Sequence, residues 1–170
     1  MLPWLAPGIA ISFVVGLAAS GAVGRSLGVR RAVAGLMLLG LGIIVAATLT
    51  PWSSPFAPGA PGPARCDLSR IGIPSWDEIL SIYDAGGNIL MFIPLGAAIG
   101  LLPRSRRKAA IIVAAVSLPF AVETIQLAVP SLDRQCEGAD VVDNLTGHMF
   151  GLVAGTVAGW VSRRVDRRPW

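Results

Sequence analysis

Apolar and polar stretches alternate along the chain in a pattern that predicts membrane-spanning helices. The five apolar stretches cover residues 5–23, 32–49, 85–102, 109–129 and 141–161. A helix needs about 20 mostly apolar residues to cross the hydrocarbon core of a bilayer. The pattern therefore predicts an all-α membrane protein, with residues 1–170 forming a single membrane domain built as a bundle of five transmembrane helices.

The polar segment between the second and third stretches contains a further helix signal. Its first part is rich in proline and is expected to be irregular. Ser75 and Glu78 then match a capping box, which marks a helix start. The apolar residues that follow share one helical face: Trp76, Ile79, Leu80 and Tyr83. We predict a short amphipathic helix over residues 76–83, which either lies on the outer membrane surface or caps the bundle.

Composition agrees with a membrane protein. Hydrophobic residues make up 54% of the chain and charged residues only 14%, whereas soluble domains carry about 25% charged residues. The formal net charge of +4 does not indicate nucleic-acid binding, because the basic residues are segregated by position. Membrane lipid is the expected surrounding partner.

The basic residues predict an orientation. Most of the 14 fall in the first hairpin loop, the loop after the third stretch and the C-terminal tail: Arg25, Arg30, Arg31, Arg104, Arg106, Arg107, Lys108, Arg163, Arg164, Arg167 and Arg168. The positive-inside rule then places the N-terminus outside and the C-terminus in the cytoplasm. The first stretch is expected to be a retained helix, since its arginines follow the apolar run, the reverse of a signal peptide.

Both cysteines fall in segments predicted to lie outside. Cys66 follows the second apolar stretch and Cys136 follows the fourth. Disulfides form and persist in that compartment, so we predict a bridge that ties the two outer segments together. Two unpaired thiols or an intermolecular bond are the alternatives.

Polar side chains gather near the outer ends of the last three apolar stretches. Helical rise places Asn88, Gln126 and Asn144 roughly 4–5 Å from those ends, and Glu123 and His148 roughly 9–10 Å from them. Glu123 and His148 could form an acid/base pair at matched depth. Alternatively, Glu123 is hydrogen-bonded or paired with Arg134, and His148 is an interhelical contact.

Two acids and four glycines of the last stretch have structural explanations. Asp140 and Asp143 lie at its start, where acids favour a helix N-terminus. The glycines recur every fourth residue, a spacing that lets helix backbones approach closely: Gly147, Gly151, Gly155 and Gly159. They predict packing within the bundle, with a dimer seam as the alternative. A single histidine with scattered carboxylates predicts no metal site.

The ordered set of these residues resembles the VanZ-like family. The run from Asn88 through Phe92 and Pro94 to Gly96 looks like its N-x-x-x-F-x-P-x-G signature. A second pattern of the family, E-x-x-Q, R, then D-x-x-x-N-x-x-G-x-x-x-G, is similar to Glu123, Gln126, Arg134, Asp140, Asn144, Gly147 and Gly151. The likeness covers residues 32–160, although the segment before Asp140 is more polar than the family pattern and His148 is outside it.

The resemblance implies a multi-pass protein of the bacterial cytoplasmic membrane, and it links the chain to resistance to the glycopeptide teicoplanin. It brings no enzyme activity and no cofactor. Three hypotheses follow. In the first, the outer polar cluster binds an amphiphile such as a lipoglycopeptide or a lipid-linked cell-wall precursor. In the second, the cluster belongs to an intramembrane enzyme with Glu123 as general base and Arg134 as an anion-binding group. In the third, the glycine-rich face of the last helix binds an assembly partner.

Overall fold

The computed structural model describes residues 4–51 and 65–165, which are mostly helical. The elements are α1 (Leu5–Leu27), α2 (Arg31–Thr48), β1 (Cys66–Asp67), α3 (Trp76–Leu80), α4 (Ala85–Gly100), α5 (Arg106–Ala128), η1 (Pro130–Leu132), β2 (Cys136–Glu137) and α6 (Gly138–Val165). Each of the five apolar stretches forms a helix, and α6 begins at Gly138, three residues before the predicted start. The proline-rich segment 52–64 and the tail residues Arg167 and Arg168 lie outside the described part of the chain.

Several of these helices are suited to a membrane. Within the described residues, α1, α2 and α5 are long and apolar enough to cross a bilayer, and α4 is a shorter apolar helix of 16 residues. Helix α6 has 28 residues and carries Asp140 in its first turn and Arg163 and Arg164 in its last. The described chain is therefore mostly helical, with several helices that could span a membrane, while a bundle of five spans remains a prediction.

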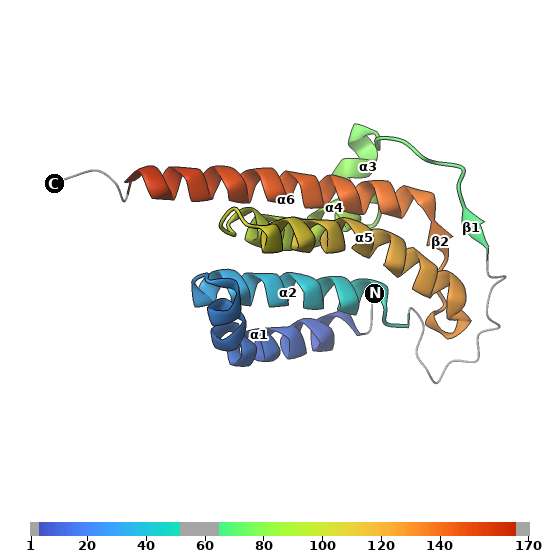
Figure 1. The fold of residues 1–170 in the computed structure, drawn as a ribbon. Coiled ribbons are helices and arrows are strands. Elements are labelled where there is room, and N and C mark those ends of the chain that lie inside the picture. Colours follow the sequence, from blue (N-terminus) through green and yellow to red (C-terminus); the bar gives the residue numbers. More distant parts are fainter. Residues whose placement is uncertain (1–3, 52–64, 166–170) are drawn as a thin grey trace.

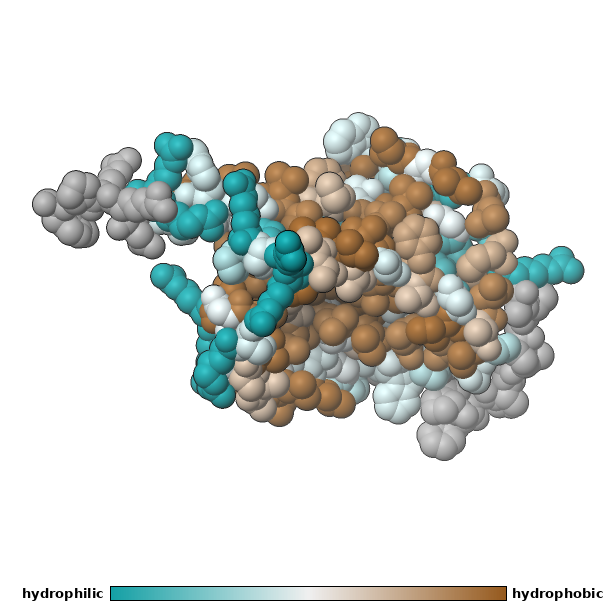
Figure 2. All heavy atoms as spheres, in the orientation of Figure 1, coloured by the Kyte–Doolittle hydropathy of each residue, from teal (hydrophilic) through white to brown (hydrophobic). Residues whose placement is uncertain are grey.

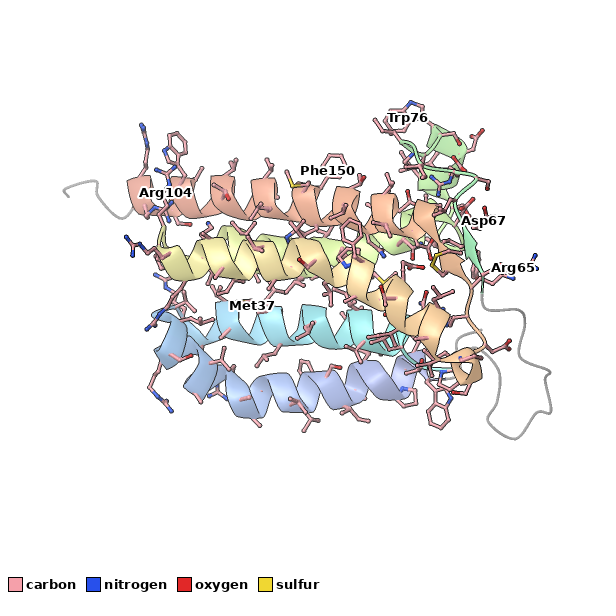
Figure 3. The ribbon with its side chains drawn as sticks, turned by 45° about the vertical axis from the view of Figure 1, so that its right-hand side comes forward. Met37, Arg65, Asp67, Trp76, Arg104 and Phe150 are labelled. Carbon is pink, nitrogen blue, oxygen red and sulfur yellow. A yellow bond between two sulfur atoms is a disulfide. The ribbon has the colours of Figure 1, made fainter. Side chains whose placement is uncertain are left out.

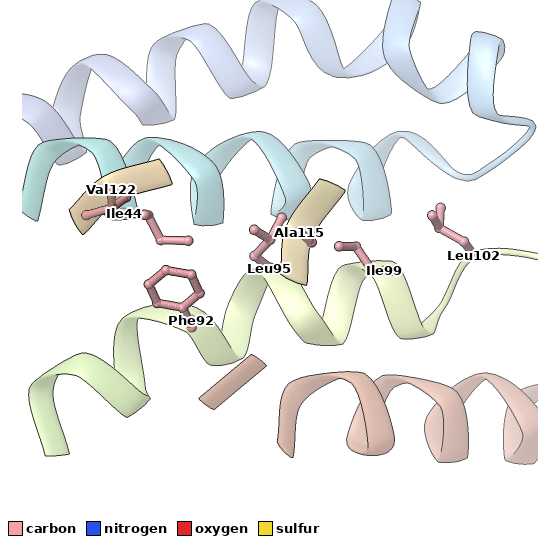
Figure 4. Packing of buried hydrophobic residues seen from close by; sticks show 7 residues of the cluster. All are labelled: Ile44, Phe92, Leu95, Ile99, Leu102, Ala115 and Val122. Carbon is pink, nitrogen blue, oxygen red and sulfur yellow. The ribbon is translucent and has the colours of Figure 1, made fainter. Parts of the chain in front are cut away.

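The helices run side by side along a common direction (Figure 1). Helices α1 and α2 form an antiparallel hairpin, α2 packs on α4, and α4 packs on α6, with α5 alongside. Side chains from α2, α4, the loop after α4 and α5 fill the apolar core (Figure 4), namely Ile44, Phe92, Leu95, Ile99, Leu102, Ala115 and Val122. This core fixes the hairpin and α5 on either side of α4.

Glycines bring the backbones of α4 and α6 together. A Cβ atom at Gly147, Gly151 or Gly155 would overlap a carbonyl oxygen of α4, while the nearest atoms to Gly159 are the side chains of Arg163 and Leu101 at ordinary or slightly tight distances. On the α4 side, Gly96 faces the backbone of His148 in the same way. This face of α6 is therefore occupied by α4 of the same chain.

The two ends of the bundle differ in charge. The α1–α2 turn, the α4–α5 loop and the end of α6 place their arginines at one end (Figure 2), where Arg104 is labelled in Figure 3. Arg107 bridges two of these segments by donating to the carbonyl oxygen of Ser26 at 2.8 Å. Every acidic residue in the described ranges lies in the opposite half of the bundle, together with Arg65, Arg70 and Arg134. We refer to these as the basic end and the acidic end.

Helix α3 starts as predicted and ends early. Ser75 and Glu78 form both hydrogen bonds of the capping box, and the N–H of Ser75 lowers the pKa of the Glu78 carboxyl. The predicted extension to Tyr83 is wrong, because Ser81 is extended and ends the helix after Leu80. Trp76 and Tyr83 are 79% and 95% exposed, so this apolar face does not cap the bundle (Figure 3).

Candidate functional site

A cluster of polar side chains lies at the acidic end, where α2 and α5 finish and α4 and α6 begin. The side chains come from four separate segments and reach across helix boundaries. They include all of the residues proposed from the sequence: Asn88, Glu123, Gln126, Arg134, Asp140, Asn144 and His148. The structure divides them into four groups, described in turn below.

Gln126 and Arg134 bind the end of α2. Gln126 donates from Nε2 to the carbonyl oxygen of Thr48 at 3.0 Å, and Arg134 donates to the carbonyl oxygens of Ala47 and Thr50 at 2.5 and 3.4 Å. The last carbonyls of a helix have no partner within the helix and carry partial negative charge. Burial lowers the pKa of the Arg134 guanidinium, and the charges of Asp140 and Glu123 oppose that effect. These two side chains therefore attach the α1–α2 hairpin to the rest of the bundle.

Glu123 binds the start of α6. Its Oε2 accepts a hydrogen bond of 2.7 Å from the backbone N–H of Glu137, the residue just before α6. A carboxylate is favoured there because the N-terminus of a helix carries partial positive charge. The side chain is 5% exposed, and its second oxygen, Oε1, has no hydrogen-bond partner among the described residues.

Asn88 and Asp140 join α4 to α6. The Asn88 amide donates from Nδ2 to Oδ1 of Asp140 at 2.6 Å. Asp140 lies in the first turn of α6, as expected for an acid near a helix N-terminus. This contact closes the cluster on the side away from α2.

Asp143 has a role that the sequence did not indicate. Because α6 begins at Gly138, Asp143 lies beyond its first turn and does not cap the helix, which corrects the expectation for this residue. It is fully buried and pairs with Arg70, with distances of 2.6 Å to Nη2 and 3.4 Å to Nη1. This hydrogen bonding to Asp143 raises the pKa of the Arg70 guanidinium. Arg70 also lies 3.7 Å from Glu78, and so links α6 to α3.

Asn144 and His148 extend the cluster into the bundle along α6. They are 1% and 0% exposed. The Asn144 Oδ1 and both ring nitrogens of His148 have no hydrogen-bond partner among the described residues, and neither has Gln126 Oε1. His148 lies ten residues beyond the start of α6, about 15 Å along the helix, whereas Glu123 contacts the residue before that start. The structure therefore does not bring Glu123 and His148 together as an acid/base pair.

A disulfide borders the cluster. Cys66 and Cys136 are bonded, which confirms the intramolecular bridge, and they face each other in the short parallel pair of β1 and β2. Glu137, which follows Cys136, donates the N–H that Glu123 accepts. The bridge therefore holds the segment that positions Glu123. No three His, Cys, Asp or Glu side chains within the described ranges come together to hold a metal ion.

Reduction of this bridge is expected to loosen the acidic end. The bond closes a loop with a sequence separation of 70, for which chain entropy corresponds to about 4 kcal/mol in a fully flexible chain. Since the loop contains membrane helices that stay ordered, we expect a smaller loss of about 2 kcal/mol. Thermal unfolding of the purified protein with and without reductant measures this loss. Thiol labelling without reductant should leave the mass unchanged, and labelled cysteines would contradict the bridge.

Comparison with known proteins gives one match. A family model described as VanZ/LLP1 matches residues 37–159, a range that includes every polar side chain of the cluster and the disulfide. No curated protein and no solved structure shows a significant match.

Proposed function

Since the chain belongs to the VanZ/LLP1 family, we propose that it is a multi-pass protein of the bacterial cytoplasmic membrane whose polar cluster binds the headgroup of an amphiphile, and that this binding contributes to teicoplanin resistance. The ligand class is a lipoglycopeptide or a lipid-linked cell-wall precursor. In this proposal the acidic end faces outward, where both kinds of molecule occur.

The proposed topology has five spans, with the N-terminus outside and the C-terminus in the cytoplasm. The segregation of arginines at the basic end supports it, because positively charged loops are retained in the cytoplasm. Helix α4 supplies about 24 Å of helix from its 16 residues, several ångströms less than the hydrocarbon core of about 30 Å, and is the shortest of the five proposed spans. The exposed apolar face of α3 then lies in the outer interface, where tryptophan and tyrosine are favoured.

Unpartnered acceptor oxygens carry the binding proposal. Glu123 Oε1, Gln126 Oε1 and Asn144 Oδ1 are all buried without a hydrogen-bond partner in the described residues. Leaving such a group unsatisfied costs about 1–3 kcal/mol, so a ligand that donates hydrogen bonds would recover that free energy. Sugar hydroxyls and peptide N–H groups are donors of this kind, and both proposed ligand classes carry them.

Asn144→Leu is the test of this proposal. Leucine has a similar volume and removes the unpartnered oxygen, so we expect the protein without ligand to become about 1 kcal/mol more stable. We also expect a host that expresses the variant to lose the teicoplanin resistance conferred by the wild-type chain. Thermal unfolding and the minimal inhibitory concentration measure the two effects. Thr146→Val is the control on the same helix, because Thr146 bonds only the carbonyl of Val142. Full resistance with Asn144→Leu would contradict the proposal.

An intramembrane enzyme that acts on a lipid-linked substrate is the second candidate. The buried Glu123, with one oxygen held and the other unpartnered, is the observation that favours it, because a general base needs such a positioned carboxylate. Glu123→Gln keeps an oxygen to accept the Glu137 N–H and removes the base. Retained ligand binding with lost substrate turnover would establish the enzyme, and unchanged turnover would exclude Glu123 as the base.

A further inference from the structure

The turn between α1 and α2 borders a shallow, largely open concavity at the basic end of the bundle. It has a volume of about 600 Å³, and its walls include Arg25, Arg30 and Arg31. The floor is made largely of glycine backbone. Gly28 adopts a left-handed conformation with φ of 67° that ends α1, and a Cβ at Gly24 would lie 3.0 Å from the carbonyl oxygen of Val29. Glycines therefore allow the chain to turn tightly between the arginines.

One arginine of the concavity is fixed and two are available. Arg31 donates from Nε to Oγ of Ser20 at 2.9 Å and from Nη2 to the carbonyl oxygen of Leu17 at 2.6 Å. Arg25 and Arg30 have exposed side chains, and neither guanidinium group forms a hydrogen bond or ion pair with another residue in the described ranges. The guanidinium group presents several N–H donors in a planar fork that matches the oxygens of a phosphate. The concavity thus combines a positioned cation with two mobile ones.

Nothing in the described structure neutralises this charge. The described acidic residues all lie in the other half of the bundle, and the first turn of α2 contains none. Two other cations of the basic end, Arg107 and Lys108, already have protein partners. Arg107 binds the carbonyl of Ser26, and Lys108 binds the carbonyls of Gly100 and Leu102. The positive potential of the α1–α2 turn is therefore left for an external anion.

The position of the concavity indicates where that anion comes from. Apolar faces of α1, including Ile11, Val14 and Val15, are exposed along the flank of the bundle that lipid chains must cover. The arginines stand at the end of that flank, where phospholipid headgroups lie. Basic pockets between transmembrane helices on the cytoplasmic side bind anionic lipid headgroups in this manner.

We infer that the α1–α2 concavity binds the phosphodiester headgroup of an anionic phospholipid of the inner leaflet, held by Arg25, Arg30 and Arg31. This site is separate from the polar cluster at the acidic end. It shares with the proposed function only the orientation of the chain in the membrane.

The test compares full-length wild-type protein with the double variant Arg25→Lys/Arg30→Lys in detergent. Lysine keeps the charge, and with it the membrane topology, but loses the planar fork of donors. Binding of phosphatidylglycerol and phosphatidylcholine is measured by native mass spectrometry. We expect phosphatidylglycerol to bind in preference to phosphatidylcholine, and the double variant to bind it about tenfold more weakly. The matched control is Arg104→Lys/Arg106→Lys, which changes two exposed arginines outside the concavity and should retain wild-type affinity.

Three results would overturn the inference. Equal binding of the two lipids would exclude a site for anionic headgroups. Equal weakening by the two double variants would show attraction to the basic end as a whole rather than a site in the turn. Displacement of phosphatidylglycerol by inorganic phosphate at a similar concentration would indicate a site for free phosphate, whereas no displacement supports the lipid. Loss of teicoplanin resistance in Asn144→Leu is independent of all three, so the two proposals can fail separately.

Discussion

Gly151→Ala is expected to destabilise the protein by about 3 kcal/mol or more, the upper range for overpacking a close contact. A methyl group at this position overlaps the carbonyl oxygen of Ile93, and backbone atoms cannot rotate away as a side chain can. The two helices must therefore move apart. Association of helices in a bilayer depends on close van der Waals packing, so separation along this seam removes much of what holds α4 to α6. Gly147→Ala and Gly155→Ala should behave alike, since they face Ile89 and Ala97 in the same way.

Gly35→Ala is the matched control for this seam. Gly35 lies within α2, and a Cβ there would be 3.6 Å from the Ser20 Cβ, which is an ordinary contact. Alanine is the better helix former by about 0.5–1 kcal/mol, so this variant should be neutral or slightly more stable. Thermal unfolding followed by circular dichroism in detergent compares the variants. If Gly151→Ala unfolds at the wild-type temperature, the backbone contact between α4 and α6 is absent in the protein.

Arg70→Ala should destabilise the protein by about 3–5 kcal/mol, because it leaves the carboxylate of Asp143 buried without a partner. Asp143 is fully buried, whereas the side chain of Arg70 is 29% exposed. The two members of the pair are therefore unequal. Arg70→Ala leaves the buried carboxylate of Asp143 without a partner. Asp143→Asn instead leaves a guanidinium that can turn toward water and Glu78, so this variant should lose less folding free energy.

The difference between the two single variants is the measurement that identifies a buried ion pair. Unfolding midpoints of Arg70→Ala, Asp143→Asn and the double variant give the coupling free energy. Arg65→Ala is the control, because Arg65 is an exposed arginine of the same outer segment and its loss should change stability by no more than about 0.5 kcal/mol. Equal, small effects of both single variants would show that the pair is not buried in solution.

Hydropathy was sufficient to predict the helices of the bundle. Each apolar stretch became a helix because a run of apolar residues in a bilayer must satisfy its backbone groups internally. The capping box placed the start of α3 at Trp76, and the predicted outer location of Cys66 and Cys136 indicated their bond. The helix signals are local, and two cysteines allow one intrachain pairing, so a single sequence contains both kinds of information.

The contacts of the polar cluster were not predictable in the same way. Residue spacing gives the depth of a residue along its own helix but not how neighbouring helices are shifted or rotated against each other. Glu123 and His148 were therefore predicted at the same depth, whereas Glu123 contacts Glu137, the residue before α6. The start of α6 was predicted three residues too late because Gly138 and Asp140 interrupt the apolar run. Arg70 was missed because it lies in an irregular segment 73 positions from Asp143, and a buried acid inside the last apolar stretch was the one signal for it.

Gln126 and Arg134 also set an order for the making of the protein. The carbonyls of Ala47, Thr48 and Thr50 receive their donors from residues that follow them by 78 to 87 positions. In the proposed topology the α1–α2 hairpin is the first part to enter the membrane, and the end of α2 stays incomplete until α5 and its following turn have been translated. A ribosome stalled before Gln126 would therefore carry an α1–α2 hairpin whose last carbonyls lack the donors from Gln126 and Arg134. Assembly of the complete bundle requires that these two residues have been translated.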